Sequence, residues 1–152
     1  MAAAGERLLA RLSPGPPGPR WPLPPDARWG ELTFRLTADE AIACTFRGQT
    51  RQLDPDFFGM RSARNRKPTA SWTALKALAI ERGVVPIADP KQVGRIQKRY
   101  QLLGKELRAA FGIREAPIAW HSGDRCYRAA FVISDERPER ARRSFAGPRR
   151  AA

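Results

Sequence analysis

The sequence has few of the residues from which metal sites and catalytic centres are built. It contains two cysteines, Cys44 and Cys126, and a single histidine, His121. A structural zinc site of the usual soft type takes four ligands, so this set excludes one, and both cysteines are expected to be buried free thiols. Nucleophilic catalysis needs a base beside a nucleophile, whereas the histidine falls at an expected hairpin tip. We therefore expect no enzyme, no metal and no cofactor.

Long apolar runs and phosphate-binding loops are also missing. No run of roughly 18 apolar residues occurs, so no membrane-spanning segment is expected. Residues 1–10 are too polar for a secretory signal, and no Gly-Lys-Ser/Thr phosphate loop is present. We expect a cytoplasmic, nucleoid-associated protein with no membrane partner.

Acidic residues are scarce relative to basic ones. The chain has 28 Lys+Arg against 15 Asp+Glu, a net charge of +13 and a pI of about 11.2. Residues 27–134 alone hold 19 basic and 10 acidic side chains, which leaves +9, so the excess is not confined to the chain ends. A basic folded domain attracts phosphate backbones. A nucleic-acid partner is favoured, and a basic protein without such a partner is the alternative.

Proline and arginine mark the two ends of the chain. Seven of the 14 prolines lie within residues 1–26, and residues 1–28 are predicted to be a disordered, proline-rich leader. Residues 135–152 consist mainly of Arg, Glu, Ala and Pro and are predicted to be a flexible basic tail. Residues 29–134 are predicted to form one domain.

The first half of this domain has the period of β-strands. Apolar residues alternate with polar ones at 32–36 and 42–46, and a third short strand is expected at 50–53. These strands predict a small antiparallel sheet. The aperiodic stretch 54–68 that follows carries a cluster of basic residues: Arg61, Arg64, Arg66 and Lys67. The sequence leaves open whether this loop is a solvated connector or contacts phosphate.

Two helices are expected next, over 69–82 and 90–111. Asp89 and Pro90 are a typical helix start, and Gly112 a typical stop. Between them, apolar residues recur every three or four positions: Val93, Ile96, Tyr100, Leu103, Leu107 and Ala110. The rest of the helix is basic and has one acid, Glu106. A helix of this kind packs one side on a core and presents the other to a negatively charged partner.

A β-hairpin is predicted over residues 117–133. Ile118 and Trp120 alternate before a turn at 122–124, and apolar residues alternate again from Tyr127 to Ile133. His121 and Arg125 fall near the hairpin tip.

The order of sheet, loop, helix, basic helix and hairpin resembles the OmpR/PhoB-type winged-helix effector domain over residues 30–134. The matching positions are Leu107, Arg108 and Phe111 at the helix end, then Ile118, Tyr127 and Arg128. Gly104 and Cys126 depart from the family pattern, and the wing tip is one residue longer. The stretch 83–103 is also too short for a separate positioning helix and a full connecting loop, so this helix is either fused into 90–111, with a bend near Gly94, or lost. The resemblance implies an α+β winged helix-turn-helix with a small N-terminal antiparallel sheet and a C-terminal hairpin called the wing. It includes no receiver domain, so control by phosphorylation is not implied.

These observations predict a bacterial transcriptional regulator that binds double-stranded DNA. Helix 90–111 would enter the major groove, and the 117–133 hairpin would meet the backbone or the minor groove. The candidate contacts are Arg95, Lys98, Arg99, Lys105 and Arg108 on the helix, with His121, Arg125 and Arg128 in the wing. An RNA-binding or ribosome-associated protein, and a protein-interaction module, are the alternatives. A homodimer or a partner in the transcription machinery is left open.

Overall fold

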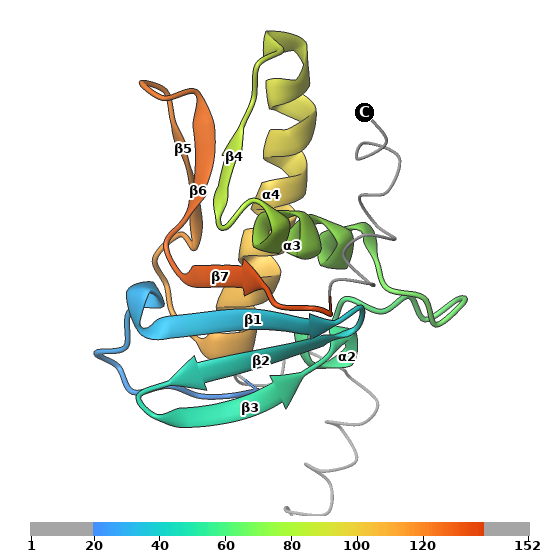
Figure 1. Ribbon diagram of the computed structural model, residues 1–152, viewed down its shortest axis with the longest axis vertical. Coiled ribbons are helices and arrows are strands. Elements are labelled where there is room, and N and C mark those ends of the chain that lie inside the picture. Colours follow the sequence, from blue (N-terminus) through green and yellow to red (C-terminus); the bar gives the residue numbers. More distant parts are fainter. Residues whose placement is uncertain (1–19, 139–152) are drawn as a thin grey trace, which may run out of the picture.

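The larger of two sheets joins strands from both ends of the described chain. The computed structural model describes residues 20–138, a mixed α+β fold (Figure 1). A short 3-10 helix, η1 (Trp29–Glu31), leads into β1 (Leu32–Ala38), β2 (Ala41–Phe46) and β3 (Gln49–Leu53). These strands pair antiparallel, as predicted, and β7 (Val132–Asp135) is added parallel to β1 in the order β3-β2-β1-β7.

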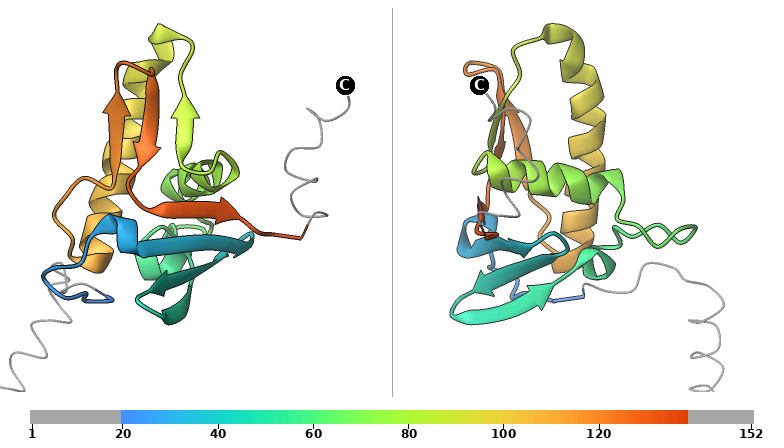
Figure 2. Two further views of the ribbon diagram at one scale, coloured as in Figure 1. Left: turned by 60° about the vertical axis from the view of Figure 1, so that its left-hand side comes forward. Right: turned by 45° about the vertical axis from the view of Figure 1, so that its right-hand side comes forward.

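The second sheet has three strands and lies beside the first half of α4 (Figure 2). β4 (Val84–Pro86) and β5 (Ile118–His121) both pair antiparallel with β6 (Cys126–Ala129), in the order β4-β6-β5. The predicted hairpin is therefore present but shorter than expected. The chain bends after Ala129, and the strand that follows, β7, belongs to the other sheet.

Burial of two side chains explains this correction to the 117–133 hairpin. Phe131 and Ile133 continue the apolar alternation, so no break in the hairpin is visible in the sequence. In the structure they leave the hairpin and become 4% and 3% exposed. The Phe131 ring lies 4.8 Å from that of Phe34, edge to face. Joining β1 removes both apolar side chains from water, which favours the bend.

Three α-helices complete the described part: α2 (Pro55–Phe58), α3 (Ala70–Ile80) and α4 (Pro90–Phe111). The start and stop predicted for α4 are confirmed. The Asp89 carboxylate accepts a hydrogen bond from the Lys91 amide at 3.0 Å, and Gly112 closes the helix with a left-handed φ of 76°. α4 is continuous through Gly94 and follows β4 after only a short connection.

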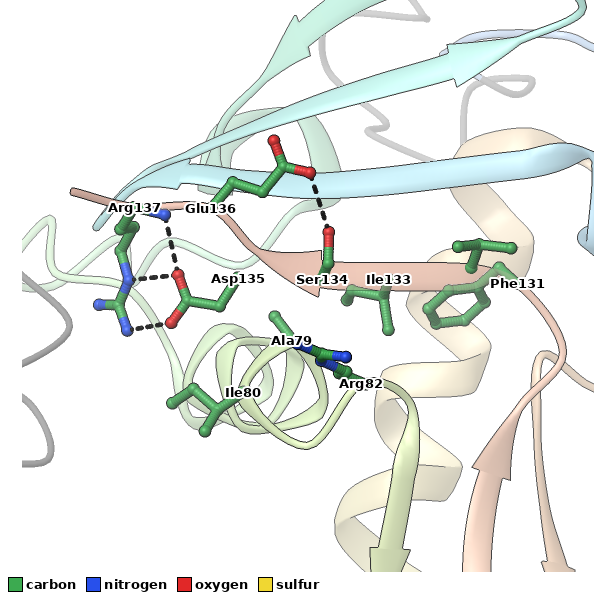
Figure 3. A pocket seen from close by; sticks show the side chains of 10 residues that line it. Ala79, Ile80, Arg82, Phe131, Ile133, Ser134, Asp135, Glu136 and Arg137 are labelled. Carbon is green, nitrogen blue, oxygen red and sulfur yellow. Dashed lines mark hydrogen bonds and ion pairs between the residues drawn. The ribbon is translucent and has the colours of Figure 1, made fainter. Parts of the chain in front are cut away.

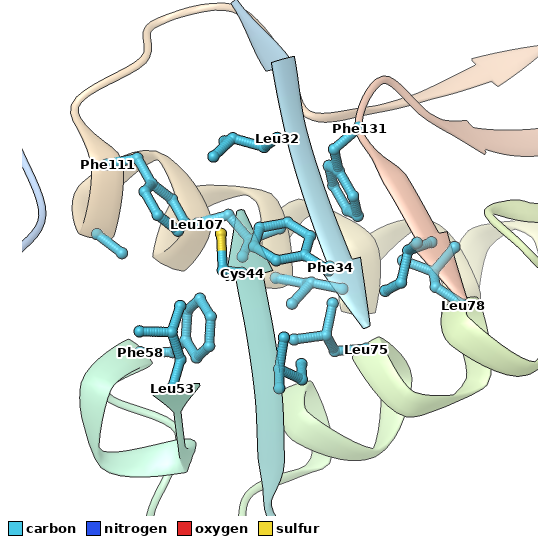
Figure 4. Close-up of a cluster of buried hydrophobic side chains, with 14 of the residues drawn as sticks. Leu32, Phe34, Cys44, Leu53, Phe58, Leu75, Leu78, Leu107, Phe111 and Phe131 are labelled. Atoms are coloured by element: carbon cyan, nitrogen blue, oxygen red, sulfur yellow. The ribbon is translucent and has the colours of Figure 1, made fainter. Parts of the chain in front are cut away.

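Aromatic and aliphatic side chains from the larger sheet and from the helices fill one core (Figure 4). Phe34, Phe58 and Phe111 contact one another, with ring centroids 5.8–6.4 Å apart. Gly104 of α4 belongs to this packing, because a Cβ there would lie 3.5 Å from Pro117 Cγ. The prolyl ring thus occupies space into which a large side chain at this position would extend.

The core extends beyond both expected domain boundaries. Trp21 is 3% exposed, its amide donates to the Ala110 carbonyl at 3.1 Å, and its ring lies 6.0 Å from Phe111. Arg137 is 1% exposed and pairs with Asp135 and Asp39. The leader and the tail therefore cannot include residues 21–28 and 135–137. The rest of both expectations, at residues 1–19 and 139–152, lies outside the described residues. No helix within residues 20–138 is long and apolar enough to cross a membrane.

Candidate nucleic-acid interface

Helix α4 is packed along its whole length on one side only. Its second half enters the core, where Leu103 and Leu107 are fully buried. Its first half rests on the three-stranded sheet. Tyr100 lies 4.9 Å from the ring of Tyr127, whose hydroxyl donates to the Val93 carbonyl at 3.5 Å. This support holds the first half of α4 away from α3 and the larger sheet (Figure 1).

The opposite side of α4 presents a row of cations, which we call the basic row. Its members, four cations and one leucine, follow one another at spacings of three or four residues and so share one side of the helix. They are Lys91, Arg95, Lys98, Leu102 and Lys105, all exposed. Within residues 20–138 no salt bridge engages any of the four cations. The row therefore keeps its full positive charge.

The one acid of α4 lies outside the basic row. Glu106 is partly buried, and burial raises the pKa of its carboxyl, while a hydrogen bond from the Ser71 hydroxyl of α3 lowers it. Its Oε1 atom has no hydrogen-bond partner among residues 20–138. The carboxylate is thus directed toward α3, and within residues 20–138 no salt bridge joins it to a cation of the row.

Two further predicted contacts flank the basic row. At 3.6 residues per turn, Arg99 and Arg108 fall roughly 80–100° to either side of it, and both are exposed. A shallow hollow in the first half of α4 is lined by Gly94, Gln97 and Gln101 together with the cations Arg95, Lys98 and Arg99. The candidate contacts were predicted from positive charge, so the neutral amides Gln97 and Gln101 were not among them. Their spacing of four residues places both on one side of the helix.

The hairpin tip lies at the amino-terminal end of α4. His121 and Arg125 are both exposed there. The Ile87 amide donates to the Arg125 carbonyl at 3.0 Å, which ties the tip to the segment just before the helix. These two predicted contacts are therefore brought to the same end of the molecule as Lys91.

Arg128 is placed differently from the other candidates. Side chains alternate along a strand, and Tyr127 faces α4, so Arg128 projects from the opposite face of β6. Its guanidinium pairs with Asp124 at 2.8 Å and donates to Cys126 Sγ at 3.5 Å. The structure thus separates Arg128 from the basic row and neutralises part of its charge.

Several titratable side chains outside the basic row are buried among apolar residues of the core. Burial raises the pKa of the Cys44 thiol and of the Tyr100 phenol to about 12. Both cysteines are free and buried, as predicted. Within residues 20–138 no group of three or more His, Cys, Asp or Glu side chains is arranged to hold a metal ion.

A separate hollow lies between α3 and β7 (Figure 3). Ala79, Ile80 and Ile133 supply apolar lining, and four of its polar or charged residues bond to one another in two pairs. Arg137 pairs with Asp135 at 2.8 Å, and the Ser134 hydroxyl donates to Glu136 at 3.2 Å. This pairing favours a structural role for the hollow.

Comparison with known proteins adds no relative to this description. The chain matches no protein-family model, no curated protein and no solved structure.

Proposed function

We propose that this chain is a DNA-binding protein of the winged-helix type, with α4 as the recognition helix and the β5–β6 hairpin as the wing. The observation that carries the proposal is the basic row. It offers four cations that form no salt bridge within residues 20–138, on the side of a helix whose other side is fixed by the core and the three-stranded sheet. Rigid support of this kind is what a recognition element requires.

The dimensions of α4 suit the major groove of duplex DNA. From Lys91 to Lys105 the row extends about 20 Å at 1.5 Å per residue, which is about six base pairs at 3.4 Å each. The groove, about 12 Å wide, admits one α-helix. The guanidinium of Arg95 and the amides of Gln97 and Gln101 are groups that pair with guanine and adenine edges, whereas lysines mostly anchor phosphate.

The arrangement of strands also favours a winged helix. The segment between the two helices supplies β4, which pairs with the C-terminal hairpin and fixes it beside α4. In the proposed complex the tip residues His121 and Arg125 meet the phosphate backbone next to the groove. Arg128 faces away and makes no contact. Control of transcription would follow from binding at specific sites.

Binding of a fluorescent duplex over a range of salt concentrations tests this proposal. The row, its flanks and the hairpin tip offer about six to eight contacts, and these alone should contribute roughly −5 to −7 to the slope of log K against log salt. The double variant Arg95→Ala/Lys98→Ala should flatten the slope by about 1.8 and lower the affinity about 60-fold at 0.1 M salt. Both side chains are exposed, so the melting temperature should not change.

A matched control removes two exposed arginines elsewhere, Arg28 and Arg114. The Trp29 indole donates to the Glu115 carbonyl at 2.7 Å, which places both arginines near η1, away from the basic row. The Arg28→Ala/Arg114→Ala variant should keep the wild-type slope. A wild-type slope near zero, or displacement of the duplex by RNA at lower concentration than by unlabelled DNA, refutes the proposal.

A further inference from the structure

We propose that residues 62–67, the basic loop between α2 and α3, contact the phosphate backbone of the duplex that binds α4, without reading its sequence. This inference rests on the proposed function and adds to it a second binding surface. Three observations carry it: the internal order of the loop, the charge it leaves exposed, and its position relative to the basic row.

The loop is held by its own hydrogen bonds. The Ser62 amide donates to the Lys67 carbonyl and the Arg66 amide to the Ser62 carbonyl, both at 2.8 Å. The Lys67 amide also donates to the Asn65 side chain at 3.0 Å. Arg61 and Pro68 form a bridge at its base. A loop fixed in this way loses little conformational freedom when it binds, which favours affinity.

One arginine anchors the loop, and the others project from it. The Arg61 side chain is only 16% exposed and pairs with Glu40 at 2.9 Å and Asp56 at 3.0 Å. It also donates to the Arg66 carbonyl at 3.0 Å. Arg64 and Lys67 are exposed, and within residues 20–138 neither takes part in a salt bridge. Arg61 is therefore a positioning residue, and Arg64 and Lys67 are the cations available to a partner.

The loop and the hairpin lie on opposite sides of α4. Two views show the loop projecting on the side of the helix away from the β4-β6-β5 sheet, at the level of α3 (Figures 1 and 2). The basic row faces that same side, because Tyr100 and Val93 on the opposite side of α4 contact the sheet. A duplex seated on the row has a phosphate backbone on each flank of the groove. The loop projects on the side that the row faces and is therefore placed for one of these two backbones.

The contact is expected to be blind to sequence. Lysine and arginine on a surface loop meet phosphates, and phosphate contacts position a protein without specifying bases. Loss of the loop cations should therefore weaken binding to every duplex by the same factor.

Salt titration of Arg64→Ala/Lys67→Ala tests the inference beside three proteins: the wild type, Arg95→Ala/Lys98→Ala, and the Arg28→Ala/Arg114→Ala control. Each is titrated with a random duplex and with a duplex selected by the wild type from a random pool. The loop variant should flatten the slope by about 1.8 and bind both duplexes about 60-fold more weakly at 0.1 M salt. The ratio between the two affinities should stay at its wild-type value. Its melting temperature should equal that of the control.

The outcomes separate the inference from the proposed function. If the wild type and the α4 variant behave as expected but the loop variant matches the control, the inference alone is wrong. If the loop variant loses its preference for the selected duplex, the loop reads bases and the sequence-blind contact is refuted. If the wild type binds no duplex, the proposed function and the inference both fail.

Discussion

Replacing Glu106 by glutamine should stabilise the protein, and the gain should depend on pH. The carboxyl lies between α4 and α3, and in the described part of the chain its Oε1 atom has no hydrogen-bond partner. A buried polar group without a partner costs about 1–3 kcal/mol and a charged one more, so replacing the carboxylate by a neutral amide of the same shape recovers part of that cost. Glu106 is only partly buried, which places the expected gain at the lower end, about 1 kcal/mol at neutral pH. For a domain of this size that corresponds to a rise in melting temperature of about 4 °C.

The sign of the pH dependence follows from the direction of the shift. Burial raises the pKa of the folded-state carboxyl above its usual value of 4.5, so between the two pKa values the folded protein binds more protons than the unfolded chain. The contribution of Glu106 to the free energy of unfolding of the wild type therefore falls as pH rises through this interval and is constant above it. The glutamine variant has no such loss. The difference between the two should be near zero at pH 4 and constant above the folded-state pKa.

Urea unfolding of both proteins between pH 4 and pH 8 measures this difference. Glu115→Gln makes the same chemical change at an exposed position and serves as the control, with no expected gain. The Ser71 hydroxyl lowers the pKa of Glu106, so Ser71→Ala should enlarge the advantage of glutamine. A gain that is the same at pH 4 and pH 8, or a variant less stable than the wild type at pH 7, would refute the assignment of Glu106 as an unfavourably buried charge.

Three further predictions separate the two sides of α4 from each other and from the arginine-rich end of the chain. Leu103 is fully buried, so Leu103→Ala should cost about 2–5 kcal/mol in a denaturant titration; an unchanged midpoint would contradict its place in the core. At the exposed Gly94 a Cβ would meet nothing within 4 Å, so Gly94→Ala should stabilise the helix by about 0.5–1 kcal/mol, and lower stability would mean that the glycine is needed there. Deletion of residues 139–152 spares Arg137 and should weaken binding to specific and random duplexes alike; loss of the preference alone would place recognition in the deleted segment.

The elements that depend on local patterns were predictable from the sequence. Alternation over residues 32–46 identified β1 and β2, and the Asp89–Pro90 start with the Gly112 stop gave both ends of α4. The spacing of its apolar residues also separated the buried side of α4 from the basic row. Each of these signals lies within one segment of the chain, where periodicity and capping chemistry are sufficient.

The features that were missed depend on contacts between distant segments. Phe131 and Ile133 fit a hairpin as well as they fit β7, and only the presence of β1 decides between them. Trp21 is buried because Phe111 and Ala110 lie beside it, although it stands among prolines. The direction of Arg128 depended on which neighbour in β6 faces α4. Local composition contains none of this information.

The pairing of β7 with β1 has a consequence for the order in which the protein is made. Phe34 pairs with Ile133, so the larger sheet is complete only when almost the whole described chain is available. Synthesis proceeds from the N-terminus, and contacts between segments distant in sequence form slowly. Until β7 has been synthesised, Phe34 and its neighbours in the core lack the contact with Phe131. A chain that stops in the hairpin would already contain the basic row and the loop, yet leave the core that supports them open.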